Sequence, residues 1–382
     1  MKKTIYSLTM FAMLVSMAAC SSDDPEDNSP CNKNEQCNPE NETGPETCTV
    51  AYIMSEGNPF SNESGALTKF NPVEKTVTAE KYFKSVNNVD LGVGPNAMTL
   101  YNGKIYLVNS GKDLTSDNGG LWVIDPATCK ATTSAMIQFN DPKDPTHKAM
   151  PRHMAFYDGK LYMSLYSGAV IAVSLDDPKT IVGSKILDAT FSEGICVAND
   201  MVYVCNSGKT GDTSAGQGNT ISYFSINDMD GTGKNVSTMT SALNPKLIKY
   251  SDETGRFYYN SLGNWTSAPL HYFTDPKDKY YTIEGVNAAD FDLTCNDIYT
   301  IYMDWTEYES QMARVSLADH KVHEYDLSEV AICGYTIKLH KGLLYVGGSS
   351  APYMYVFDKE TGELLYNVNT KVYTTSSIVF AN

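Results

Sequence analysis

The sequence repeats one phrase of alternating apolar residues, and this repetition constrains the fold more than any other feature. The segment PRHMAFYDGKLYMSLYSG at 151–168 follows the pattern of PNAMTLYNGKIYLVNSG at 95–111. Both begin with proline, alternate apolar and polar positions, and turn on Asp-Gly or Asn-Gly. Such dipeptides tolerate the positive φ of a tight two-residue turn, and period-two alternation marks half-buried strands. Each phrase therefore predicts a β-hairpin.

The same hairpin phrase occurs six times along the chain. Further copies lie at 192–208, 245–263, 287–303 and 334–349. Each copy is followed by a third strand of similar composition, and we expect a fourth short strand after it. The third strands are LWVID at 121, VIAVS at 170, ISYFS at 221, LHYFT at 270, ARVSL at 313 and MYVFD at 354.

The two ends of the repeats supply a seventh unit. TVAYIM at 49–54 and ALTKF at 66 resemble a second and a third strand, and TTSSIVFAN at 374–382 resembles the missing first strand. Four-stranded units repeating every 40 or 50 residues or so are the signature of a β-propeller. We therefore predict an all-β, seven-bladed β-propeller over 49–382, closed by pairing of the N- and C-terminal strands in one blade. The alternative, several β-sandwich domains, would need units that differ from one another.

The first 48 residues lie outside the repeats and predict an exported lipoprotein. Residues 1–19 read as a lipoprotein signal peptide, with two lysines, a short apolar run and small residues before Cys20. We expect Cys20 to be lipidated. Residues 21–48 hold no aliphatic or aromatic side chain, so 20–48 predicts a lipidated cysteine followed by a disordered acidic tether.

The charge of the chain bears on its location and partners. The acidic cluster at 23–27 resembles the signal that exports Bacteroidota lipoproteins to the cell surface, and it also fits an ordinary solvated linker. The expected localisation is the outer membrane, lipid-anchored and exposed at the cell surface. The formal net charge of −16 argues against nucleic acid as a partner, because phosphate binding needs a basic surface.

The state of the remaining cysteines is left open by the sequence. Cys31, Cys37 and Cys48 lie in the tether without metal-type spacing, while Cys196 and Cys205 lie on paired strands of one hairpin. An exported chain could pair its cysteines, and buried thiols are equally compatible with the pattern.

Motifs that carry catalysis are missing from the sequence. The six histidines fall in different blades or on different faces of the predicted propeller, so no metal site is expected from them. Asn227, Asp228 and Asp230 offer oxygens for calcium, but no glutamate follows at EF-hand spacing and a polar turn is the favoured interpretation. No nucleophile elbow or phosphate-binding loop occurs. We therefore expect a binding protein without enzymatic activity, resident cofactor or metal.

The predicted topology divides the connections between two faces of the disc. Short turns join first to second strands on one face, which we name the turn face. The other face, which we name the loop face, carries the second-to-third and fourth-to-first connections and most long loops. Aromatic residues on loops above a rigid scaffold favour ligand binding, although each could instead cap its own blade. These residues are Phe60, Tyr166, Trp265, Trp305, Tyr308 and Tyr353.

The repeat alignment also predicts a ring of residues at the loop-face mouth of the central channel. One residue begins each innermost strand, and no two are alike. A mixed ring suits one asymmetric ligand, and Arg152 with Glu193 could equally form an ion pair that closes the channel. The ring consists of Asn96, Arg152, Glu193, Lys246, Ala288, Tyr335 and Thr375.

Several of these motifs resemble a known family. EGNPFSNESGALTKFNP near the first blade, YLVN and YVCN with NSG, and the PR of the second repeat are similar to YVTN-type β-propeller surface lipoproteins of Bacteroidota, in particular the BtuG-like lipoproteins that capture cobalamin. The resemblance covers 49–382, and its motifs specify the fold more strongly than the ligand. It implies capture of a corrinoid and its delivery to a TonB-dependent transporter of the BtuB type, without catalysis.

Other functions remain compatible with the same residues. A glycan-binding lipoprotein would also use exposed tryptophans, and a catecholate siderophore would favour several basic residues at the mouth, where the sequence places Arg152 and Lys246. A propeller hydrolase or lactonase would show an activity lost with a chelator. A purely structural role, such as adhesion, would show no saturable small ligand.

Overall fold

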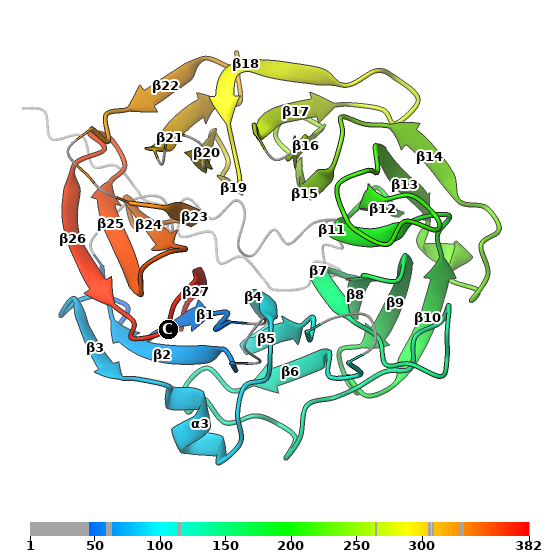
Figure 1. The fold of residues 1–382 in the computed structure, drawn as a ribbon, viewed down its shortest axis with the longest axis horizontal. Coiled ribbons are helices and arrows are strands. Elements are labelled where there is room, and N and C mark those ends of the chain that lie inside the picture. Colours follow the sequence, from blue (N-terminus) through cyan, green and yellow to red (C-terminus); the bar gives the residue numbers. More distant parts are fainter. Residues whose placement is uncertain are drawn as a thin grey trace, which may run out of the picture.

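The computed structural model describes residues 46–58, 63–112, 116–263, 266–304, 307, 309–328, 330 and 332–381. They form seven antiparallel sheets arranged as blades around a central axis (Figure 1). The predicted seven-bladed propeller is therefore confirmed. The signal peptide, Cys20 and the tether up to residue 45 lie outside the described residues.

Each blade runs from an inner strand at the axis to an outer strand at the rim. The first blade contains β27 (Thr375–Phe380), β1 (Ala51–Ser55), β2 (Ala66–Asn71) and β3 (Thr76–Ala79). The second contains β4 (Pro95–Tyr101), β5 (Lys104–Asn109) and β6 (Gly120–Ile124), and the third β7 (Pro151–Tyr157), β8 (Lys160–Leu165), β9 (Ala169–Ser174) and β10 (Ile181–Ile186).

The remaining four blades each have four strands in chain order. The fourth blade holds β11 (Thr190–Ala198), β12 (Met201–Gly208), β13 (Thr220–Ser225) and β14 (Ser237–Thr240), and the fifth β15 (Pro245–Ser251), β16 (Arg256–Ser261), β17 (Pro269–Phe273) and β18 (Tyr281–Asn287). The sixth holds β19 (Asp290–Leu293), β20 (Asp297–Asp304), β21 (Glu309–Ser316) and β22 (Val322–Tyr325), and the seventh β23 (Gly334–His340), β24 (Leu343–Gly348), β25 (Tyr353–Asp358) and β26 (Leu364–Asn369).

Two short helices complete the described secondary structure. The helix α3 (Tyr82–Asn87) follows β3 on the rim, and the 3-10 turn η2 (Ile226–Asp228) follows β13. Among the described residues, no helix is both long and apolar enough to cross a bilayer.

The ring is closed as the sequence predicts. The strand β27 pairs antiparallel with β1, with Ile378 opposite Ile53, and supplies the inner strand of the blade that β1–β3 complete. Backbone bonds extend the closure at both ends of the pair, from Glu56 N to Thr374 O and from Ala381 N to Val50 O. The chain therefore enters the first blade and leaves it on the turn face.

The predicted fourth strand of the second blade is wrong. The structure describes only isolated bridges outside β6, which pair Leu121 with Ile137 and Ile124 with Ala131. Leu121 and Ile124 are three residues apart in β6, whereas their partners Ile137 and Ala131 are six residues apart in the following segment. The extra residues between Ala131 and Ile137 break the ladder, so this blade has three strands.

The hairpin turns have the geometry that their sequences require. Asn102 and Gly103 have φ of 45° and 68°, and Asp158 and Gly159 have φ of 47° and 66°. Both residues of each turn are left-handed, as a two-residue hairpin loop of this type demands. The predicted hairpins at 95–111 and 151–168 are confirmed in register by the β4–β5 and β7–β8 pairs.

Packing between neighbouring blades forms the core. One cluster joins Val108 of β5 and Val123 of β6 to Phe156, Leu161 and Ile171 of the next blade, and similar clusters lie between other neighbours. The repeated second-strand tyrosines are all buried there, as expected from their period. They are Tyr106, Tyr162, Tyr203, Tyr258, Tyr299 and Tyr345.

Part of the cysteine question is answered by the fold. Cys48, Cys129, Cys205 and Cys333 are unpaired thiols. The β11–β12 register places Cys196 opposite Tyr203, so the two cysteines of that hairpin are not partners across the ladder. For these four cysteines the structure therefore favours free thiols over disulfide bonds.

Candidate functional site

A network of charges crosses the loop-face end of the channel. Glu193 on β11 lies between Arg152 on β7 and Lys246 on β15, with its Oε2 2.9 Å from Arg152 Nε and its Oε1 2.5 Å from Lys246 Nζ. The three residues lie near the loop-face ends of the inner strands of successive blades, which is why the ring aligned from the repeats brings them together. We name Arg152, Glu193 and Lys246 the mouth network.

The network is fixed by further contacts around Arg152. Its guanidinium donates to Ser110 Oγ at 3.1 Å and lies 4.5 Å from the ring centroid of Tyr166. Asn96 donates from Nδ2 to the backbone oxygen of Arg152. The ion pair that the sequence left as one alternative is therefore present, and it holds Tyr166 and Asn96 against the same arginine.

Burial and charge set the protonation of the network. The side chain of Glu193 is fully buried, which by itself would raise its pKa, but Arg152 and Lys246 outweigh this effect and hold the pKa of Glu193 at about 2. Burial lowers the pKa of His153, the next residue on β7, to about 3 even though Glu193 lies 3.9 Å away. At neutral pH the site thus holds an ionised Glu193 beside an uncharged His153.

A second carboxyl group joins the mouth from another blade. Glu56, in the connection after β1, accepts a hydrogen bond from Tyr335 Oη at 3.0 Å, and its backbone N–H donates to Thr374 O. Burial raises the pKa of Glu56 to about 7, against the opposing effects of Tyr335, Arg152 and Lys246. Glu56 also raises the pKa of Tyr335 well above its usual value. Glu56 was not among the residues predicted from the sequence.

Exposed apolar and aromatic side chains also lie on the loop face. Tyr335 begins β23 and is 36% exposed, while Tyr373 precedes β27 and is 57% exposed. Leu243, in the connection before β15, is 40% exposed. All three lie in connections or strand starts on the loop face, so this face offers aromatic surface around a charged floor.

The predicted site residues divide into three groups. Asn96, Arg152, Tyr166, Glu193, Lys246 and Tyr335 belong to one connected region at the mouth, while Ala288 and Thr375 of the ring are buried. Tyr353 begins β25, and its ring lies 6.1 Å from that of Tyr355. The other predicted residues lie outside the described residues, and these are Cys20, Phe60, Trp265, Trp305 and Tyr308.

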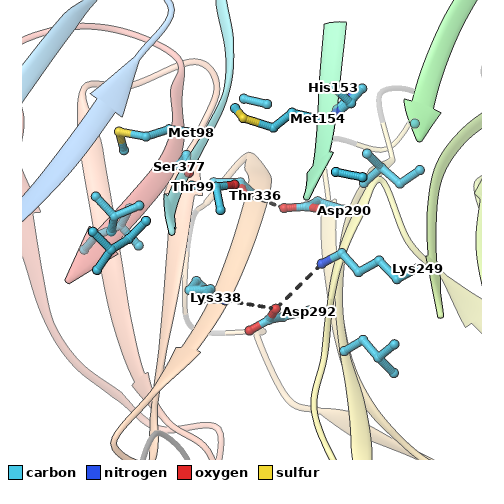
Figure 2. A pocket seen from close by; sticks show the side chains of 18 of the residues that line it. Met98, Thr99, His153, Met154, Lys249, Asp290, Asp292, Thr336, Lys338 and Ser377 are labelled. Carbon is cyan, nitrogen blue, oxygen red and sulfur yellow. Dashed lines mark hydrogen bonds and ion pairs between the residues drawn. The ribbon is translucent and has the colours of Figure 1, made fainter. Parts of the chain in front are cut away.

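A cavity of about 640 Å³ follows the axis on the turn-face side of the mouth network. Its lining runs from Asn96 and His153 to Asn102 in the β4–β5 turn and Thr294 after β19, and includes residues from the inner strands of all seven blades. Figure 2 shows Lys249, Lys338 and Asp292 in this cavity, with dashed lines joining both lysines to the carboxylate. Of the predicted site residues, only Asn96 lines it.

The sequence carried a signal for the residues that were missed. Lys249, Asp290, Asp292 and Lys338 are charged residues inside predicted inner strands, where apolar side chains are usual. Reading the inner strands beyond their first position would have found them. Tyr373 and Glu56 lie in connections, and no periodic pattern marks them.

The calcium alternative does not gain support from the geometry. Asp230 pairs with the buried Lys185 ammonium, 3.1 Å from its Oδ1, and the same ammonium donates to Asp228 O at 2.6 Å. A lysine thus fills the place that a cation would take in this turn. In the part of the chain that the structure describes, no three His, Cys, Asp or Glu side chains are grouped to hold a metal ion.

Comparison with known proteins identifies the fold and no family. No family model matches the chain, and no curated protein matches it in sequence. Among solved structures, a candidate 6-phosphogluconolactonase from Bacteroides fragilis NCTC 9343 is 12% identical with a TM-score of 0.60, covering 89% of this chain and 100% of that one. Another from Bacteroides uniformis ATCC 8492 is 13% identical with a TM-score of 0.59, covering 87% and 99%.

A third similar structure is apo AztD from Citrobacter koseri. It is 10% identical, with a TM-score of 0.51, and the match covers 86% of this chain and 97% of that one. At such identities these likenesses establish only the β-propeller fold of this chain. They carry no information about its ligand.

Proposed function

We propose that this chain is a non-catalytic, surface-exposed lipoprotein that captures cobalamin or a related corrinoid and delivers it to a TonB-dependent outer-membrane transporter. The observation that carries the proposal is the loop-face mouth. There a fixed floor of mixed charge, made by the mouth network, lies near the partly exposed ring of Tyr335, and the exposed Tyr373 lies on the same face in the connection before β27. A corrinoid is large, flat and asymmetric, with amide arms and a phosphate, and such a surface suits it.

The protonation of Glu193 and the adjacent His153 supports binding without catalysis, whereas the Glu56 carboxyl group, whose pKa is raised to about 7, could exchange a proton at neutral pH. The one histidine beside Glu193 is His153, and its pKa of about 3 makes it a weak base at neutral pH. General acid–base catalysis favours groups whose pKa lies near the working pH. Glu193 itself is held by two cations and is fully buried, so it is poorly placed to attack or protonate a substrate.

The same contacts weigh against the siderophore alternative. A catecholate ligand would need free positive charge at the mouth, but Arg152 and Lys246 already share Glu193. Removing them from that carboxylate would leave a buried charge without its partners, which is costly. A neutral or zwitterionic ligand avoids this cost.

Calorimetric titration of the full chain with cyanocobalamin tests the proposal. We expect saturable one-to-one binding, weakened about tenfold or more by Tyr335→Ala or Tyr373→Ala, since buried aromatic contacts often dominate an interface. Trp265→Ala and Trp305→Ala test the two predicted loop tryptophans. Tyr281→Ala is the matched control, because Tyr281 is 47% exposed but lies at the start of the outer strand β18.

The outcomes separate the alternatives. If cyanocobalamin gave no heat of binding, the corrinoid proposal would be wrong. Saturable heat with a panel of glycans would favour the glycan-binding alternative. Turnover of a lactone that is lost with a chelator would favour a hydrolase. Equal affinity in all variants would move the ligand away from the loop face.

Delivery to a transporter is tested in cells. We expect the chain to be cleaved by protease added to intact cells, and Cys20→Ala to slow the uptake of labelled cobalamin. Uptake that is unchanged by Cys20→Ala and by deletion of the chain would contradict the proposed partner.

A further inference from the structure

The axial cavity is distinct from the loop-face mouth. None of the mouth network residues lines it, and its lining continues to the turns on the opposite face. Glu193 and its two cations lie near the loop-face starts of their strands, toward the opposite end of the axis from the turns that line the cavity. The cavity therefore needs an explanation of its own.

The two carboxylates in the cavity have a structural role. Asp290 Oδ2 accepts the backbone N–H of Ile337 at 3.0 Å and the hydroxyl of Thr336 at 2.5 Å. Asp292 Oδ2 accepts the backbone N–H of Leu339 at 2.9 Å. The inner edge of β23 has no neighbouring strand to satisfy these amides, so the aspartates of β19 take that place. The fold itself thus accounts for both acidic residues.

The two lysines meet at one of these carboxylates. Lys249 on β15 and Lys338 on β23 approach the same oxygen, Asp292 Oδ1, at 3.7 and 3.4 Å from opposite sides. Lys249 Nζ also donates to the backbone oxygen of Phe291 at 2.6 Å. The lysine side chains are 29% and 34% exposed, whereas that of Asp292 is 8% exposed. Both ammonium groups thus reach the cavity beside one carboxylate oxygen, at distances from that oxygen longer than a good hydrogen bond.

The surroundings of the lysines suit a small polar ligand. The labelled side chains in Figure 2 include the hydroxyls of Thr99, Thr336 and Ser377 and the thioethers of Met98 and Met154. Burial raises the pKa of Asp290, against the opposing effects of Lys249 and of the hydrogen bonds from Thr336 and Ile337. Two ammonium groups and several hydroxyls thus face the cavity at this level of the axis, beside the carboxyl groups of Asp290 and Asp292.

We propose that the axial cavity is a second binding site, open to the turn face, for a small molecule whose carboxylate or phosphate group lies between Lys249 and Lys338. The ligand oxygens accept hydrogen bonds from the two ammonium groups in place of Asp292 Oδ1. The hydroxyls lining the cavity bind the remaining polar groups. The chain as a whole has a net charge of −16, so the attraction is local to these two lysines.

Titration of the full chain with inorganic phosphate, succinate and citrate at low ionic strength tests this site. At least one of the three binds saturably, and the preferred probe distinguishes a phosphate ligand from a carboxylate ligand. Lys249→Met and Lys338→Met each weaken that binding about tenfold or more, because one unit charge is removed near the anion. Lys84→Met is the matched control, since Lys84 pairs with Asp90 at the exposed rim.

Asp292→Asn provides the sharpest arm of the test. Asparagine keeps an oxygen for the Leu339 N–H but removes the charge that competes with the ligand, so the preferred anion binds about tenfold more tightly. If Asp292 and its lysines served only to hold strands together, the native chain would bind none of the three probes, whatever this variant bound. Thermal unfolding of each variant shows whether it is folded. If Asp292→Asn is not folded, the two lysine variants still test the site.

Two results would overturn the site. They are the lack of saturable binding for all three probes, and equal affinities of Lys338→Met, Lys249→Met and Lys84→Met. Failure here is separable from failure of the corrinoid proposal, because Lys338→Met should leave cyanocobalamin binding at the loop face unchanged.

Discussion

Glu193 shows at the scale of a single residue how the mouth is held. Glu193→Gln would leave Arg152 and Lys246 as buried cations without their carboxylate. Breaking a buried pair in this way costs about 3–5 kcal/mol of unfolding free energy, to be measured by urea denaturation. Glu360→Gln is the control, because Glu360 pairs with Arg314 at the exposed rim and the expected loss is below about 1 kcal/mol. Equal losses would show that the network does not stabilise the fold.

Glu56 provides a prediction about pH. Its pKa is raised to about 7 in the folded chain from an ordinary value of 4.5, so the folded state binds the proton more tightly. The stability that this group contributes is fully present below pH 4.5 and is lost as the pH rises to about 7. Glu56→Gln keeps the uncharged form at every pH.

The variant should therefore gain stability relative to the native chain between these pH values, by at most about 3 kcal/mol. Urea denaturation of both proteins across this range measures the difference. A difference that stays constant with pH would contradict the raised pKa of Glu56.

The sequence predicted some of the mouth residues but not their contacts. Counting positions along the repeats placed Arg152, Glu193 and Lys246 at the mouth, since the inner strands share one register. Whether Arg152 met Glu193 or a ligand depended on distances between blades, which no repeat pattern contains. Glu56 was missed because its partner Tyr335 lies 279 residues away and in a different blade.

At the scale of the element, hairpins were predictable because their signals are local. The dipeptide Asn102-Gly103 and the alternation beside it suffice to specify β4 and β5. The prediction of a fourth strand in the second blade was wrong because the register of such a strand depends on its partner strand. Leu121 and Ile124 bridge to Ile137 and Ala131, and the spacing between those partners excludes a continuous ladder.

The hairpin turn itself can be tested. Asn102→Val places a β-branched residue at a φ of 45°, where valine is strained by roughly 1–2 kcal/mol. We expect a loss of that size in the free energy of unfolding. Asn367→Val is the control, since Asn367 is exposed in the extended strand β26 and valine is favoured there. A loss as large at Asn367 would show that the substitution and not the turn is responsible.

The closing strand β27 makes a second prediction at this scale. Ile378 is 4% exposed and lies opposite Ile53, so Ile378→Ala leaves a cavity in the first blade and costs about 2–5 kcal/mol. Ile181, 40% exposed on β10, loses less than about 0.5 kcal/mol when changed to alanine. Thermal or urea unfolding of both variants measures the contrast. A small loss at Ile378 would mean that closure adds little to stability.

The whole molecule has two proposed sites on one axis, with the mouth network between them. Because Arg152, Glu193 and Lys246 do not line the axial cavity, we expect the ligands of the two sites to bind independently. The dissociation constant for cyanocobalamin should change by less than about twofold when the axial cavity is saturated with its preferred anion, a coupling too small to count as allosteric. Titrations with and without the anion measure this. A larger change would show that the mouth network transmits binding from one end to the other.

The architecture of the whole ring was predictable because β1–β3 formed a unit without a first strand and the last residues of the repeats provided one. The location of the axial cavity was not predictable, since its volume depends on how seven different inner strands meet. The identity of the ligand depends on how the inner strands pack and on the loops, so it has to be measured.

Ring closure by β27 also determines when the protein can fold. A chain made from its N-terminus produces β1 first and β27 last, and these two strands are direct partners. Until β27 is made, β1 carries an edge of unpaired N–H and C=O groups, which invites pairing with other strands. The seven blades therefore reach their final arrangement only after β27 has been made. The order in which the strands are synthesised, and not the stability of any one blade, determines when the complete propeller can first form.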